Sequence, residues 1–94
     1  MKLVYRYNPD ILKIEEKPDG KDVEFNIQIL KETPYLNELR KVRNFFDEND
    51  VYTDVLFYAY ADHKFQVIVR QDYYNDFIIE LIRHHLLQSI EWVD

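Results

Sequence analysis

The chain has 94 residues, of which 47% are hydrophobic and 32% are charged, a composition that suits one small folded domain spanning residues 1–94. The absence of cysteine excludes disulfides, zinc–thiolate sites, iron–sulfur clusters and thiol catalysis. The formal net charge of −6 opposes binding to nucleic acid, which is itself a polyanion.

Residues 3–7 predict a short strand, which the turn signal Asn8-Pro9-Asp10 closes. This opening segment is too short for the core of a signal peptide, and Arg6 interrupts it. The longest charge-poor stretch, residues 55–61, is far shorter than a membrane span. We therefore expect a cytoplasmic protein with no membrane partner.

Residues 11–16 and 23–29 flank Pro18-Asp19-Gly20 and predict a β-hairpin. A two-residue turn at Asp19-Gly20 would pair Ile14 with Phe25 and Leu12 with Ile27. The alternation of the second strand predicts its buried face, made of Val23, Phe25, Ile27 and Ile29.

Thr33-Pro34 predicts the start of a helix, because a capping hydroxyl precedes a proline at the first helical position. This helix should end within residues 47–50. The spacing of its apolar residues predicts a buried side, made of Tyr35, Leu39, Val42 and Phe46 with Leu36 and Phe45 beside them.

Residues 51–60 and 65–70 predict a second hairpin around Asp62-His63, and a closing helix should follow from about residue 73 to residue 90, capped by Asp72. The expected fold is α+β, with an antiparallel sheet of four to five strands, two helices packed on one face, and the order β-ββ-α-ββ-α. An offset of forty residues superposes residues 25–29 on 65–69, but amphipathic segments also align by chance, so an internal duplication stays open.

The second hairpin breaks the usual alternation of a half-buried antiparallel strand. Pairing Tyr60 with Phe65 would place Leu56, Tyr58 and Tyr60 on the buried face. The opposite face would then carry Val55, Phe57, Ala59 and Ile68, which are also apolar. Either other parts of the chain cover this face, or it presents an apolar patch to a partner, and we favour the partner because the first hairpin is polar on that side.

The predicted closing helix also carries more apolar surface than one sheet contact requires. Its apolar residues cover well over half of the helix circumference, and Trp92 and Val93 follow it. This surplus indicates contact either with a partner or with the first helix.

Few residues of the sequence are suited to catalysis or to ligand binding. Glu80 and His84 stand four positions apart and could supply two metal ligands, and His85 and Ser89 share that spacing and could imitate a base–nucleophile pair. For both pairs we favour a structural explanation, an ordinary helical contact or a histidine at the margin of the core. The acidic residues 47–50 and Asp54 lack the central glycine and closing glutamate of an EF-hand, and Gly20, the only glycine, is needed for a turn, which excludes glycine-rich phosphate loops.

The sequence therefore predicts a small acidic protein-binding module, of an accessory, regulatory or inhibitory kind, whose partner is another protein or a second copy in a homodimer. The predicted interface residues are Val55, Phe57, Ile68 and Trp92, because large apolar and aromatic side chains dominate interface energetics. We expect no cofactor and no nucleic-acid partner. The alternative is a small enzyme or metal-binding protein that uses Glu80, His84 and His85.

Overall fold

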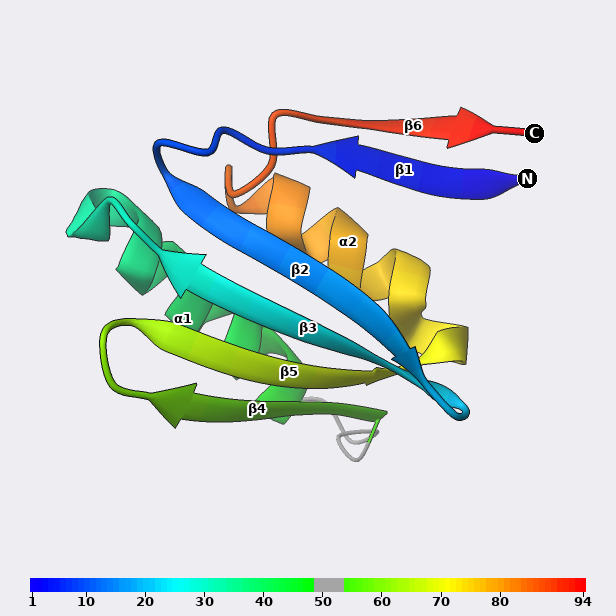
Figure 1. The fold of residues 1–94 in the computed structure, drawn as a ribbon, viewed down its shortest axis with the longest axis horizontal. Coiled ribbons are helices and arrows are strands. Elements are labelled where there is room, and N and C mark those ends of the chain that lie inside the picture. The colour runs from blue at the N-terminus through cyan, green and yellow to red at the C-terminus, as the bar shows by residue number, and fades with distance from the viewer. Residues whose placement is uncertain (49–53) are drawn as a thin grey trace.

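A computed structural model describes residues 1–48 and 54–94, and over these ranges it contains six antiparallel strands and two α-helices in the order βββαββαβ (Figure 1). The predicted α+β class is confirmed. Residue 51, where the fourth strand was expected to begin, lies outside the described residues. The bounds in chain order are β1 Lys2–Arg6, β2 Leu12–Asp19, β3 Asp22–Ile29, α1 Glu32–Asp47, β4 Val55–Tyr60, β5 Lys64–Arg70, α2 Tyr74–Arg83 and β6 Ser89–Val93.

The strands form two sheets. The larger sheet has the order β2-β3-β5-β4, so β2 and β4 are its edges, and β1 pairs with β6 in a separate two-stranded ribbon. Both helices lie on one face of the larger sheet, and the ribbon runs beside β2, at the side of the sheet away from β4 (Figure 1). Neither helix of the described chain is long and apolar enough to cross a membrane.

The core lies between the larger sheet and the helices. Phe77 of α2 is fully buried at its centre, and its ring centroid lies 4.8 Å from that of Phe25, 6.1 Å from that of Phe46 and 6.1 Å from that of Phe57. These partners come from β3, α1 and β4, so one aromatic side chain contacts three other elements. Leu36, Leu39, Val42 and Phe46 of α1 are buried, which agrees with the predicted apolar side except that Tyr35 is only half-buried and Phe45 is 41% exposed.

The first hairpin has the predicted faces but a different register. Its turn consists of Gly20 and Lys21, with Gly20 at a φ of +64°, and Ile14 pairs with Ile27 instead of Phe25. Leu12 likewise pairs with Ile29. A shift of two residues keeps every side chain on its face, which is why the predicted buried face is correct although the pairing is not.

The second hairpin reverses the predicted faces. Tyr60 pairs with Lys64 and not with Phe65, so a three-residue loop, 61–63, joins the strands, with positive φ at Asp62 and His63. A shift of one residue moves each β4 side chain to the other face. The placement of Val55 and Phe57 on the open face is therefore wrong: Val55 is only 3% exposed, and Phe57 is half-buried against Phe77.

The last helix is shorter than predicted. It ends at Arg83, where the Leu86 N–H donates to the Leu81 carbonyl and the His85 N–H donates to the Ile82 carbonyl, each at 3.0 Å. These two bonds, with His85 at a φ of +63°, form a Schellman motif, which stops a helix. Residues 89–93 form β6, and Leu86 and Leu87 are buried in the core, so the broad apolar surface predicted for a helix over residues 73–90 does not exist.

Neither predicted side-chain cap forms. Thr33 lies inside the first turn of α1 with extended dihedral angles, and no side-chain hydrogen bond caps that helix or α2. Asp72 instead belongs to a short 3₁₀ turn, Gln71–Tyr73, that leads into α2.

Candidate functional site

The exposed apolar side chains of the larger sheet gather on one edge strand. On the face away from the helices, β2 and β3 present mainly charged and amide side chains, such as Lys13, Glu15 and Asn26. Strand β4 presents Leu56, Tyr58 and Tyr60 there, and these are 40%, 46% and 59% exposed. The outer face is therefore polar except along β4 and the adjoining Ile68, which pairs with Leu56.

The hydrogen-bond pattern of the sheet shows which backbone groups of β4 point away from it. The Ile29 N–H donates to the His63 carbonyl, so odd-numbered residues of β5 bond to β3, and its even-numbered residues bond to β4. Through the register of β4 with β5, Leu56, Tyr58 and Tyr60 bond inward. The N–H and C=O groups of Val55, Phe57 and Ala59 consequently face outward from the edge.

The opposite edge, β2, is protected against strand pairing, whereas β4 is not. By the same alternation, the outward positions of β2 include Pro18, which has no N–H, Leu12, whose N–H donates to the Asn8 carbonyl at 3.3 Å, and Ile14, whose carbonyl accepts from the Tyr7 hydroxyl at 3.3 Å. Charged side chains and proline are the usual means of blocking an edge. Strand β4, with the sequence VLFYAY, has neither, and the described residues give its outward groups no hydrogen-bond partner.

A shallow hollow of about 330 Å³ adjoins β4 on the same face. It is bordered by Asp54, Leu56, Ile68 and Arg70, together with Lys21 and Asp22. The Arg70 guanidinium lies 3.1 Å from the Asp54 carboxylate, whose side chain is only 8% exposed. The hollow therefore offers an apolar wall, from Leu56 and Ile68, beside a paired carboxylate and guanidinium.

The four predicted interface residues do not form one surface. Ile68 lies on the outer face beside Leu56, whereas Val55 and Phe57 point into the core. Trp92 is 52% exposed on β6, opposite Leu3 of β1. Strands β6 and β4 lie at opposite sides of the molecule, so Trp92 is remote from the β4 edge (Figure 1).

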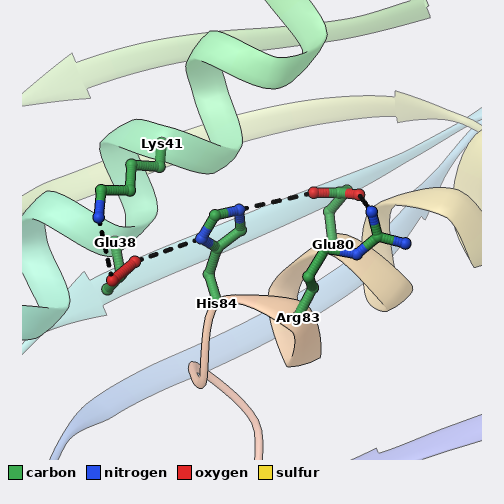
Figure 2. Close-up of polar contacts among 5 residues, drawn as sticks. All are labelled: Glu38, Lys41, Glu80, Arg83 and His84. Atoms are coloured by element: carbon green, nitrogen blue, oxygen red, sulfur yellow. Dashed lines mark hydrogen bonds and ion pairs between the residues drawn. The ribbon is translucent and has the colours of Figure 1, made fainter.

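A second group of side chains joins the two helices. Figure 2 shows Lys41, Glu38, His84, Glu80 and Arg83 in a row that runs from α1 to α2. The His84 Nδ1 lies 3.2 Å from the Glu38 carboxylate, and its Nε2 lies 3.7 Å from the Glu80 carboxylate. Lys41 and Arg83 lie 3.4 Å from Glu38 and Glu80, respectively, so each carboxylate contacts two basic side chains.

The surroundings of Glu38 shift its acidity. Burial opposes ionisation, but the hydrogen bond with His84 and the contacts with Lys41 outweigh it, so the pKa of Glu38 lies below its usual value. The carboxylate form is therefore favoured in the folded protein.

The arrangement brings Glu80 and His84 together as their spacing predicted, but it leaves out His85. That residue is exposed beyond the end of α2, and Ser89 lies on β6, so their helical spacing no longer applies. Within residues 1–48 and 54–94, no three His, Asp or Glu side chains are grouped so that they could hold a metal ion. Of the acidic stretch, Asn49 and Asp50 lie outside the described residues, and Asp54 pairs with Arg70.

Comparison with known proteins gives the chain no relative: no protein-family model, no curated protein and no solved structure matches it.

Sequence reasoning missed the exposed face of β4 and the partner of His84. The first depended on the length of the second hairpin loop, since three loop residues instead of four exchange the two faces of β4. The second is a contact between residues 46 positions apart, for which the local sequence carries no signal.

Proposed function

We propose that the protein is a protein-binding module that accepts a strand of its partner at the open edge of β4. The observation that carries this proposal is an uncharged edge strand with outward-facing backbone groups and three exposed apolar or aromatic side chains, Leu56, Tyr58 and Tyr60. In strand addition, backbone hydrogen bonds supply affinity and alternate side chains supply specificity.

The proposal changes the roles of the residues selected from the sequence. Val55 and Phe57 would contact the partner through their backbone, while their side chains fix β4 to the core. Leu56, Tyr58 and Ile68 would form the side-chain contact surface. Tyrosine is well suited to this position because it combines a large apolar ring with a hydrogen-bonding hydroxyl.

Site-specific photo-crosslinking in the native host tests this proposal. A photoreactive phenylalanine analogue at Tyr58 should give adducts with a bound chain, because this side chain lies beside the incoming strand. The matched control carries the same analogue at Glu15, on the outer face of the protected strand β2. Equal adduct yields at the two positions, or none at Tyr58, would contradict strand addition at β4.

A further inference from the structure

We infer that the strand accepted by β4 is β4 of a second copy, antiparallel to the first, with a two-fold axis beside Phe57 and a continuous eight-stranded sheet as the result. This inference rests on the proposed function. It names the partner and the register, which the proposed function leaves open.

The backbone of β4 is complementary to itself in this register. The outward groups belong to Val55, Phe57 and Ala59, spaced two residues apart. A two-fold axis beside Phe57 pairs this residue with its own copy and pairs Val55 with Ala59 of the second copy. Each of these pairs can exchange two N–H···O=C bonds, giving about six hydrogen bonds across the axis.

The same register brings apolar side chains together at the centre of the outer face. Leu56 of each copy faces Tyr58 of the other, because directly opposite residues of antiparallel strands share a face. Ile68 of each copy adjoins this group through its pairing with Leu56. The contact therefore has an apolar centre made of Leu56, Tyr58 and Ile68 from both copies, as expected for a specific interface.

The ends of the contact are polar and complementary. Tyr60 of each copy faces Asp54 of the other and enters the hollow bordered by Asp54, Leu56, Ile68 and Arg70. Its ring would meet the apolar wall. Its hydroxyl, which within one copy donates to the Gln66 Oε1 at 3.3 Å, would donate to the carboxylate instead. Across both copies the row reads Lys64, Tyr60, Asp54 and Arg70, in which the single carboxylate lies between a phenol and a cation.

Neighbouring two-fold registers are less favourable. An axis beside Val55 would place Leu56 opposite Asp54, and an axis beside Ala59 would place Leu56 opposite Asp62. Both would desolvate a carboxylate against an apolar side chain, which costs free energy. Of these three axes, only the one beside Phe57 pairs the full length of β4 and keeps the carboxylates of Asp54 and Asp62 away from Leu56.

Charge favours this mode of association over other contacts between copies. Each copy carries a formal net charge of −6, so two copies repel each other. Strand β4 contains no charged residue, whereas each of the other five described strands contains at least one. Because salt screens the remaining repulsion over a Debye length of about 8 Å at physiological ionic strength, dimerisation should strengthen as salt concentration rises.

Analytical ultracentrifugation of the parent, Ala59→Pro and Ala59→Val proteins tests the inference. The parent should sediment at twice its chain mass of 11.6 kDa. Ala59→Pro removes an outward N–H without removing a bond to β5, since proline is tolerated where the N–H faces away from the sheet. It should sediment as a monomer with its circular dichroism retained, while Ala59→Val, which keeps the N–H, stays dimeric.

A cysteine exchange experiment tests the register and does not depend on the proline variant. The chain has no native cysteine, so Leu56→Cys and Tyr58→Cys proteins can be mixed under oxidising conditions. Their facing Cα atoms would lie about 4.5 Å apart, within disulfide range. The mixed disulfide should form faster than either homodisulfide, because identical positions are offset along the strands.

The outcomes separate the two proposals. A monomeric parent at high concentration and high salt overturns the second-copy inference, and so does a folded Ala59→Pro protein that remains dimeric. If crosslinking from Tyr58 then captures a different protein, strand addition at β4 stands with another partner. Absence of both dimer and adduct overturns both.

Discussion

The imidazole of His84 links two helices because each of its nitrogens faces a carboxylate from a different one. Glu38 comes from α1 and Glu80 from α2, and Glu80 is almost completely buried. A buried carboxylate needs polar partners, and Glu80 has them in His84 and Arg83. At the scale of single residues, this cluster is therefore a polar contact that joins α1 to α2, and both ring nitrogens of His84 take part in it.

The lowered pKa of Glu38 gives this cluster a pH dependence. A carboxyl group whose pKa is lower in the folded state stabilises the fold above its unfolded pKa, and this stabilisation is lost as pH falls through the folded value. Glu38→Gln should lower the free energy of unfolding at pH 7 by less than about 1 kcal/mol, because Glu38 is partly solvated.

This effect is measured by urea unfolding of the parent and Glu38→Gln proteins at pH 7 and at a series of lower pH values, down to about two pH units below the ordinary carboxyl pKa. The difference should be present at neutral pH and vanish in acid. Glu48→Gln, at the exposed end of α1, is the matched control and should show no such trend. A difference that stays constant with pH would contradict the assigned role of Glu38.

At the scale of elements, the Glu16 carboxylate of β2 joins the β1–β6 ribbon and α2 through one tyrosine from each. Tyr5 of β1 and Tyr74 of α2 both donate to the Glu16 carboxylate of β2. Burial, together with this neighbouring carboxylate, raises the pKa of both phenols above the usual value. Both phenols therefore stay protonated at neutral pH and can donate these hydrogen bonds.

At the end of α2, His85 adopts a left-handed backbone conformation, which residues other than glycine rarely adopt. His85 occupies the left-handed position of the Schellman motif, which glycine fills most often. Because a left-handed conformation costs an L-residue roughly 1 kcal/mol or more, His85→Gly should stabilise the protein by about 1 kcal/mol.

Thermal or denaturant unfolding of His85→Gly measures this gain. The control is His84→Gly, which replaces a residue with negative φ and removes both carboxylate contacts, and should be destabilising. If His85→Gly is as destabilising as His84→Gly, the prediction is wrong, and the His85 side chain stabilises the fold by more than its left-handed conformation costs.

Elements were predictable from the sequence where apolar and polar residues follow a clear strand or helix period. The alternation of residues 23–29 and the helical spacing from Leu36 to Phe46 gave β3 and α1 with their buried faces. The end of α2 was not predictable, since His85 stands where a Schellman motif usually has glycine, and Leu86 and Ile90 continue the apolar helical spacing of Ile79 and Ile82. The faces of β4 were not predictable either, because VLFYAY carries no polar residue to distinguish them.

At the scale of the whole molecule, the larger sheet has two unlike edges. Proline, local hydrogen bonds and charged side chains protect β2, while β4 is left with outward backbone groups and an exposed aromatic strip. The order of elements from β1 to α2, and hence the α+β class, could be predicted from the sequence, whereas the final strand β6 was not predicted. The identity of the open edge could not, because it depends on long-range pairing between β3 and β5.

Residue-resolved amide hydrogen exchange tests the openness of the β4 edge most directly. In the Ala59→Pro protein, and in the parent at high dilution, the Phe57 amide should exchange quickly while the Leu56 and Tyr58 amides, bonded to β5, exchange slowly. In the parent, raising the protein concentration should slow exchange at Phe57 and Ala59 and leave Leu56 and Tyr58 little changed. If Phe57 exchanges as slowly as its neighbours in the monomer, the edge is already closed within the chain and the account of this protein as a strand acceptor is wrong.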